Sequence, residues 1–321
     1  MEPAPMEPAL IVENLSLALG RANLVDSVGF SVAPGEVLAL VGESGCGKSV
    51  TAQAIMRLLA PALRQTGGRV LLAGQDITAL PERAMRALRG QAMSMIFQEP
   101  QAALDPLATV GTHIAEALRR PLRDVRDQVL QMLAEVGISD PARRIDQYPF
   151  ELSGGMCQRV MIACALISRP AVLLADEPTT ALDVTIQAQI LDLLRRLAAE
   201  RRTAVVLITH DMGVVADIAD RVAVMYAGRI AETGPTAQIF ARPRHPYTSL
   251  LLASIPRLTD APKSALAVIE GRVPTPAEFG PGCRFASRCP LADDTCRAAT
   301  PPLRDMGDGR LSACFHAEQL P

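Results

Sequence analysis

The hydrophobic pattern of residues 10–235 predicts alternating strands and helices. Apolar and polar side chains alternate over 10–20 and 28–33, as in half-buried strands. Apolar runs predict further strands at 37–41, 70–72, 93–97, 171–175, 204–209 and 221–226. A helical period predicts helices at 49–59, 111–136 with a break at Pro121, 156–167, 186–200 and 213–219. This alternation is typical of an α/β domain with a largely parallel sheet.

The pattern changes after about residue 234. Proline becomes frequent, regular periodicity fades, and four of the seven cysteines lie between Cys283 and Cys314. The first residues are also rich in proline. We therefore predict a flexible N-terminus over 1–9, one α/β domain over 10–235, and a cysteine-containing extension over 236–321, called the tail below.

Composition and charge narrow the class of protein. Hydrophobic residues make up 49% of the 321 positions, so the chain can bury a sizeable core although it has no Trp. The net charge is −2 and no run of five basic residues occurs, so nucleic acid is not an expected partner. Neither a signal peptide nor an apolar run of roughly 20 residues, as a membrane span requires, is present. We expect a soluble, cytosolic protein without a disulfide framework.

The pattern of a P-loop is met by Gly42-Glu43-Ser44-Gly45-Cys46-Gly47-Lys48-Ser49. The segment follows the predicted strand 37–41 and opens a predicted helix, which is the context that a P-loop requires. Unpaired N–H groups at the helix N-terminus attract phosphates, and Gly45 and Gly47 let the backbone approach them closely. Lys48 adds a full positive charge, and the Ser49 hydroxyl can bind Mg²⁺. The segment therefore predicts binding of a nucleoside triphosphate.

Polar side chains also follow three other predicted strands. Asp176 ends a hydrophobic strand, and we expect it to hold Mg²⁺ directly or through water. Glu177 is the group expected to polarise the attacking water. Gln98 and His210 follow their own strands, at the edge where α/β sheets bind ligands. We expect Gln98 to touch Mg²⁺ and the attacking water, and His210 to touch the γ-phosphate.

A second anion site is predicted at Leu152-Ser153-Gly154-Gly155. These residues precede the predicted helix 156–167, so Ser153 can cap the helix while the two glycines expose backbone N–H groups. An ordinary capped helix without a ligand is the alternative for four residues taken alone.

Together these motifs resemble the ATP-binding-cassette (ABC) family over residues 10–235. They occur in the family's order, as GESGCGKS, IFQEP, LSGGMCQRV, AVLLADEP, ALD at 181–183 and ITHD. The resemblance implies the α/β fold of a RecA-like P-loop NTPase, with a helical subdomain at about 100–165. It implies that ATP is contacted by Gly42, Ser44, Gly45, Cys46, Gly47, Lys48, Ser49 and Val50.

The resemblance also implies a dimer, because two cassettes of this family pack head to tail. Each ATP then lies between the P-loop of one cassette and the LSGG segment of the other. Ser153, Gly154 and Gly155 would serve the partner's nucleotide, and Asp183 would support the seam between the two cassettes.

The segments YPFELSGGM and RHPYT (244–248) and the cysteine-bearing tail resemble the D-type ATPase subunit of peptide and nickel importers. This resemblance implies ATP-driven import of dipeptides, oligopeptides or nickel-like solutes, at the cytoplasmic face of the cell membrane. The implied partners are a second, similar ATPase, two membrane permeases and, indirectly, a solute-binding protein.

One departure from the family concerns the base of the nucleotide. The family stacks an aromatic ring on adenine, whereas this chain has Leu19 near that position, so weak base recognition is expected.

The tail cysteines Cys283, Cys289, Cys296 and Cys314 are separated by five, six and 17 residues. This spacing lacks the short C-x₂₋₄-C knuckle of common zinc sites. Four thiolates suit a [4Fe–4S] cluster, and the resemblance implies one in this place. Zinc and unligated thiols stay open as alternatives. We expect His245 and His316 to be surface or packing residues rather than extra ligands.

A soluble ABC ATPase of DNA repair or translation is the rival function. Long-armed repair ATPases need a coiled-coil insertion between the motifs at Gln98 and Ser153, and only 54 residues intervene here. Translation ATPases carry two cassettes and basic inserts, whereas this chain has one cassette and a slightly acidic balance. A purely regulatory nucleotide switch, the second rival, would not need Glu177.

Overall fold

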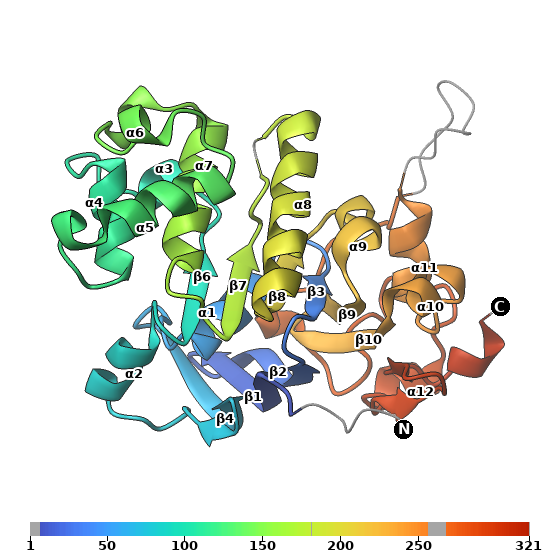
Figure 1. Ribbon diagram of the computed structural model, residues 1–321. Coiled ribbons are helices and arrows are strands. Elements are labelled where there is room, and N and C mark those ends of the chain that lie inside the picture. The colour runs from blue at the N-terminus through green and yellow to red at the C-terminus, as the bar shows by residue number, and fades with distance from the viewer. Residues whose placement is uncertain (1–6, 181, 256–267, 321) are drawn as a thin grey trace, which may run out of the picture. The chain divides into compact units, whose positions relative to one another are not determined.

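A computed structural model describes residues 7–180, 182–255 and 268–320 of the chain (Figure 1). Most of the N-terminal segment predicted to be flexible (residues 1–6) and Ala181 of the ALD motif lie outside the described residues. The described chain divides into two compact units. The first holds residues 7–10, 32–37 and 71–207, and the second holds residues 11–31, 38–70, 208–255 and 268–320.

The first unit contains a sheet of three hydrophobic strands. β6 (Met93–Ile96) pairs in parallel with β7 (Val172–Asp176), and β8 (Ala204–Thr209), most of which belongs to this unit, neighbours β7. All residues of these strands are buried, as expected for strands covered on both faces. Because β6 and β7 are parallel, their carboxyl ends meet at one edge of the sheet.

Five helices of the first unit pack against one another, as the green ribbons in Figure 1 show. They are α3 (Pro100–Ala103), α4 (Val110–Ala117), α5 (Leu122–Glu135), α6 (Pro141–Arg144) and α7 (Gly154–Leu166). The predicted break at Pro121 is confirmed, because Pro121 directly precedes α5 and separates it from α4. The unit also contains β5 (Gln75–Asp76), α2 (Glu82–Leu88), α8 (Val184–Arg201) and a 3₁₀ turn at Pro149–Glu151.

The second unit contains two sheets. In one, β1 (Leu10–Leu19) lies between β2 (Ala22–Val32) and β4 (Leu63–Leu72). In the other, β9 (Arg221–Tyr226) pairs in parallel with β3 (Val37–Val41) and in antiparallel orientation with β10 (Arg229–Pro235). The tail extends this sheet, because β10 also pairs with β12 (Leu311–Ser312), which pairs with β11 (Arg304–Asp305).

The tail contributes to the hydrophobic core of the second unit. Tyr247 and Phe285 are fully buried in one cluster with Val41, Val222 and Tyr226. The tail is therefore packed directly against β3, which leads into the P-loop, and against β9. The helices of this unit are α1 (Lys48–Ile55), α9 (Met212–Ile218), α10 (Thr236–Ala241), α11 (Pro246–Ala253) and α12 (Asp294–Ala298), with 3₁₀ turns at Pro276–Glu278 and Ala317–Gln319.

Several predicted elements differ in extent from those observed. The predicted strand at 28–33 is the end of the longer β2, and the one at 70–72 is the end of β4. The first half of β2 gave no regular pattern because Ser27, with φ of 54°, interrupts the alternation of side chains. The predicted helix at 49–59 ends at Ile55. Across residues 7–180, 182–255 and 268–320, no helix combines the length and apolarity needed to cross a bilayer.

Candidate functional site: the nucleotide-binding motifs and the cysteine-lined tail

The P-loop connects β3 to α1, which confirms the predicted strand–loop–helix context. Glycine is required at Gly42, which has φ of 151°, because a Cβ atom there would lie 2.1 Å from the carbonyl oxygen of Met225. Gly47 is the N-cap of α1 and has φ of 101°. The first turn of α1 therefore begins at the loop, which is the arrangement of an anion site at a helix N-terminus.

Lys48, the predicted phosphate-binding lysine, is buried within the P-loop. Its Nζ donates to the carbonyl oxygens of Gly42, at 2.7 Å, and of Glu43, at 3.1 Å, and the residue is only 6% exposed. Cys46 is fully buried beside it, and burial raises the pKa of its thiol. The remaining predicted contacts of the loop are accessible: Ser44 and Gly45 are exposed, and Ser49 and Val50 are half-buried.

Three polar side chains gather at the carboxyl edge of β6 and β7 in the first unit. The Nε2 atom of Gln98 donates to Oε2 of Glu177 at 3.1 Å, and Oγ1 of Thr180 donates to the same oxygen at 2.9 Å. Asp176 ends β7 and is 5% exposed. Gln98 and Glu177, which were predicted from two separate strands, thus lie in contact. Thr180 was missed, although its position one turn after Glu177 places both in the same turn.

His210 lies in the second unit, directly after β8, and is exposed. The next residue, Asp211, caps α9 by accepting from the N–H groups of Gly213, at 2.8 Å, and of Val214, at 3.4 Å. This cap fixes the point at which the chain leaves β8, and His210 is thereby presented to solvent at the strand's carboxyl end.

The LSGG segment has the geometry of a capped helix with an open N-terminus. Ser153 is the N-cap of α7 and its Oγ accepts from the N–H of Met156 at 3.4 Å, which confirms the predicted cap. Ser153 and Gly154 are exposed, and a Cβ added to Gly154 would meet nothing within 4 Å. The predicted dimer residue Asp183 is the N-cap of α8, where its Oδ1 accepts from the N–H of Ile186 at 3.0 Å.

The four tail cysteines line one small cavity in the second unit, with His245 and His316. The four thiols form no disulfide. Burial raises the pKa of each thiol, to about 11 for Cys314, where the other three thiols add to the rise. Thiols with a raised pKa are mostly protonated at neutral pH, and a bound metal ion would favour their deprotonation. Because they line one cavity, the four cysteines are candidate ligands for a metal ion or cluster.

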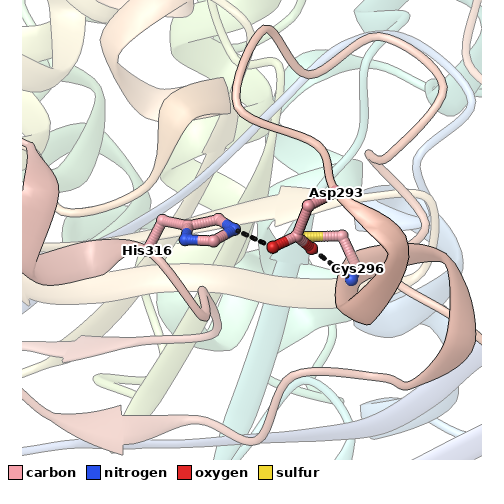
Figure 2. A group of neighbouring side chains, drawn as sticks. All are labelled: Asp293, Cys296 and His316. Atoms are coloured by element: carbon pink, nitrogen blue, oxygen red, sulfur yellow. Dashed lines mark hydrogen bonds and ion pairs between the residues drawn. The ribbon is translucent and has the colours of Figure 1, made fainter.

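A more compact group of possible ligands overlaps the cavity. The ligand atoms of Asp293, Cys296 and His316 lie within 4.8 Å of one another, as Figure 2 shows. Oδ2 of Asp293 lies 3.2 Å from Nε2 of His316, and Oδ1 accepts from the N–H of Cys296 at 2.9 Å. Asp293 was missed by sequence reasoning. His245 is the packing residue that was expected, since it is buried and its Nδ1 caps α11.

Comparison with known proteins agrees with these motifs. Residues 25–180 match the family model described as ABC transporter, and residues 231–296 match the oligopeptide/dipeptide transporter C-terminal region. The chain is 48% identical to the dipeptide transport ATP-binding protein DppD of Bacillus subtilis, over 98% of this chain and 96% of that protein. It is 49% identical to a putative peptide import ATP-binding protein of Brucella ovis, over 92% of each chain.

A solved structure shares the fold. It is a dimeric ATP-binding cassette in a post-hydrolysis state with bound ADP and Pi, 26% identical in sequence, with a TM-score of 0.63. It covers 71% of this chain and 98% of its own. The fold is thus the predicted α/β nucleotide-binding domain, and the chain belongs to the oligopeptide/dipeptide family of ABC transporter ATPases.

Proposed function

We propose that this chain is the ATP-hydrolysing subunit that energises a membrane ABC importer of dipeptides or oligopeptides. The observation that carries the hydrolytic part is the hydrogen bond between Gln98 and Glu177, directly after the buried carboxylate of Asp176. The transport part is supported by relatives that carry peptide-import names and match at least 92% of the chain. Solutes of the nickel class are the alternative cargo.

The proposed chemistry assigns one role to each motif of the cassette, residues 10–235. The N–H groups of the P-loop and the ammonium of Lys48 bind the β- and γ-phosphates. The Ser49 hydroxyl and the Asp176 carboxylate are the groups suited to hold Mg²⁺, with Gln98 as a further contact. Glu177 accepts the proton of the attacking water, and His210 contacts the γ-phosphate. When ATP binds, Lys48 would exchange its hydrogen bonds to the carbonyl oxygens of Gly42 and Glu43 for bonds to phosphate.

The proposed active form contains two cassettes. Ser153, Gly154 and Gly155 would bind the γ-phosphate of ATP held by a second, similar ATPase chain, which is supported by their open helix N-terminus. Asp183, as the N-cap of α8, would hold that helix at the seam. Two permeases would anchor the pair at the cytoplasmic face of the membrane, and a solute-binding protein would act on the far side. Nucleic acid is not a proposed partner.

The extension, residues 236–321, would hold a metal centre with a structural role. Cys283, Cys289, Cys296 and Cys314 would ligate an iron–sulfur cluster, which is supported by their common cavity. The alternative is zinc on Asp293, Cys296 and His316, a donor set that zinc accepts and that is already compact. Metal binding would stabilise this proline-rich segment, because binding energy becomes folding energy.

Two conservative variants separate the metal proposals. Asp293→Asn should leave iron and sulfide content unchanged if the cluster is correct, but should abolish zinc binding if the compact group is correct. Cys289 belongs to the four-cysteine set only. Cys289→Ser should therefore lose iron and sulfide if the cluster is correct, and should leave zinc binding unchanged if the compact group is correct. Metal content is measured by elemental analysis of protein purified without air.

Affinity purification from membranes tests the transport proposal. A tagged chain should retain two very hydrophobic permeases and a second ATPase of similar length. Recovery of nucleic acid or ribosomal proteins in place of membrane subunits would contradict the proposal.

A further inference from the structure

The tail is attached to the P-loop by a partly buried ion pair, in which the Glu43 side chain is 29% exposed. Arg288 donates from Nη1 to Oε2 of Glu43 at 2.6 Å and from Nη2 to Oε1 at 3.0 Å, so both carboxylate oxygens are engaged. The Arg288 side chain is 4% exposed. Such two-point pairing fixes orientation as well as distance, because the planar guanidinium matches the carboxylate. Glu43 is the second residue of the P-loop, so Arg288 holds the loop where it leaves β3.

Tyr247 of the tail, packed in a cluster of aromatic rings, binds the backbone of the same loop residue. Phe285, three residues before Arg288, packs its ring 5.3 Å from the ring of Tyr247 and 5.0 Å from that of Tyr226. The Tyr247 hydroxyl accepts a hydrogen bond from the N–H of Glu43 at 2.9 Å. Both the side chain and the backbone of Glu43 are thus held by tail residues.

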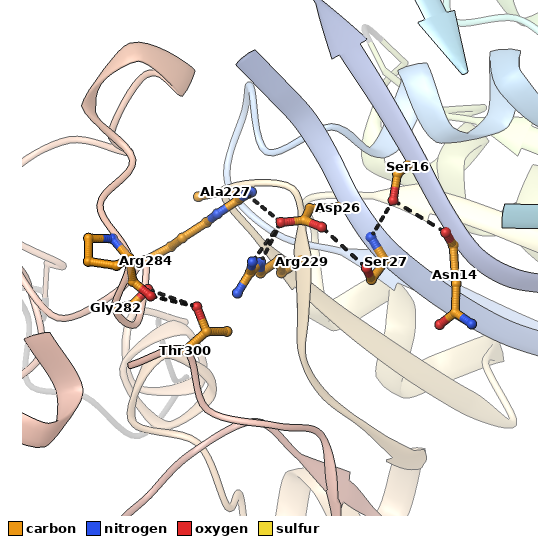
Figure 3. A network of polar contacts seen from close by, with 10 residues as sticks. Asn14, Ser16, Asp26, Ser27, Ala227, Arg229, Gly282, Arg284 and Thr300 are labelled. Carbon is orange, nitrogen blue, oxygen red and sulfur yellow. Dashed lines mark hydrogen bonds and ion pairs between the residues drawn. The ribbon is translucent and has the colours of Figure 1, made fainter. Parts of the chain in front are cut away.

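A second link between the tail and the loop starts at Arg284, whose contact with Asp26 is drawn in Figure 3. Arg284 donates to Oδ2 of Asp26 at 2.9 Å and to the carbonyl oxygen of Ala227. The N–H of Asp26 donates to the carbonyl of Gly228 at 2.8 Å, and the N–H of Gly228 donates to the carbonyl of Cys46 at 2.9 Å. Arg284 therefore reaches the P-loop through a continuous chain of hydrogen bonds.

Both arginines are adjacent in sequence to cysteines that line the tail cavity: Arg284 follows Cys283 and Arg288 precedes Cys289. We propose that Arg288 is a positioning residue of the nucleotide site, through which the cysteine-lined tail sets the affinity of the P-loop for ATP. The proposal rests on the proposed ATP binding by this loop. Displacement of Cys289 moves Arg288, and with it the Glu43 peptide that Lys48 contacts.

The charges of Glu43 and Arg288 predict the direction in which loss of Arg288 changes ATP affinity. Glu43 places a carboxylate in a loop that binds a polyanion, and Arg288 neutralises it at contact distance. Loss of Arg288 leaves a carboxylate that repels phosphate and whose side chain no longer anchors the loop. A weakened ATP affinity is the expected result, and removal of the carboxylate should restore part of it.

The test is a double-mutant cycle in the full chain, in a Glu177→Gln background in which hydrolysis does not interfere. ATP with Mg²⁺ is titrated calorimetrically. Arg288→Ala should weaken binding about tenfold, Arg288→Lys less, and Arg288→Ala combined with Glu43→Gln should regain most of the loss. The matched control is Arg272→Ala, which breaks an exposed tail ion pair with Glu278 and should leave binding unchanged.

Cys289→Ser tests the link to the tail. It should weaken ATP binding about as much as Arg288→Ala, and add little when Arg288 is already alanine. Amide exchange of residues 42–49 should accelerate in both variants, whereas exchange in β7 should stay unchanged and so report an intact fold. Wild-type affinity and exchange in Arg288→Ala, or additive effects of the two changes, would overturn the proposal. Unchanged ATP binding in Lys48→Ala would instead overturn the proposed function of the loop.

Discussion

Gln98 and Glu177, 79 residues apart, are joined by a hydrogen bond of 3.1 Å at the carboxyl edge of the parallel pair β6 and β7. The bond orients the Glu177 carboxylate, and Oγ1 of Thr180 donates to the same oxygen at 2.9 Å. Two donors on one oxygen fix the orientation of the carboxylate. This relation places the general base of the proposed reaction on the rigid edge of a sheet rather than on a free loop.

Glu177→Gln should separate ATP binding from hydrolysis. The amide retains the shape of the carboxylate but cannot accept a proton, so the rate of ATP hydrolysis should fall about 10²- to 10⁴-fold. ATP affinity should change little, because the phosphates are bound by other residues. Thr180→Ala is the matched control: it removes an orienting donor but keeps the base, and its loss of rate should be smaller. Equal losses in the two variants would argue against Glu177 as the base.

Lys48→Ala should abolish ATP binding, because it removes the full positive charge of the P-loop. It also leaves the carbonyls of Gly42 and Glu43 without their buried donor. Each lost partner of this kind costs about 1–3 kcal/mol, so the free energy of unfolding should fall as well. Equilibrium binding of ATP and urea denaturation measure the two effects. Ser44→Ala, at an exposed position in the same loop, removes no charge and no buried donor, so its effects on binding and on stability should both be smaller.

ATP and GTP should bind with similar affinity. Leu19, near the expected place of the base, is 49% exposed at the end of β1 and offers no aromatic face. Leu19→Tyr should add affinity for both nucleotides, since stacking on one base is worth about 1–3 kcal/mol. Competition of GTP against labelled ATP measures the preference. An adenine preference above about a hundredfold in the wild type would show that another residue recognises the base.

The stability of the chain should fall as pH rises through the titration of Glu232. This residue of β10 is fully buried, and burial raises its pKa from 4.5 to about 7. In the unfolded chain Glu232 releases its proton near pH 4.5, whereas in the folded chain it keeps the proton to about pH 7. Between these two pH values the folded state binds more protons than the unfolded state. The contribution of Glu232 to the free energy of unfolding is therefore complete below pH 4.5 and is lost as pH rises to 7 and above.

Glu232→Gln isolates this effect. The variant should gain stability relative to the wild type as pH rises from 4.5 to 7, by up to about 3 kcal/mol. Burial lowers the pKa of the nearby His245 to about 4, which gives a slope of opposite sign, but this contribution is common to both proteins and cancels in the difference. Urea denaturation across this pH range makes the comparison. A constant difference between the two proteins would contradict the prediction.

Local signals were sufficient to predict much of this structure. The helix break at Pro121, the cap at Ser153 and the polar residues at strand ends depend on neighbours in sequence, and the structure confirms them. The ties between the tail and the P-loop could not be predicted in this way. Glu43 and Arg288 are 245 residues apart, and Arg288 lies in a segment without periodicity. Only folding brings such a pair together, and a single sequence carries no signal for it.

Uptake of a labelled dipeptide into vesicles that contain the complete transporter is the most direct measurement of the proposed function. The chain is assembled with its permeases, the second ATPase and the solute-binding protein, with ATP on the side that carries the cassettes. Wild-type complex should accumulate the dipeptide only with hydrolysable ATP, and ATP hydrolysis should rise when the loaded solute-binding protein is added. Glu177→Gln should bind ATP but accumulate almost no dipeptide. Uptake that is unaffected by Glu177→Gln, or ATP hydrolysis at full rate by the isolated monomeric chain, would contradict a transport-coupled composite ATPase.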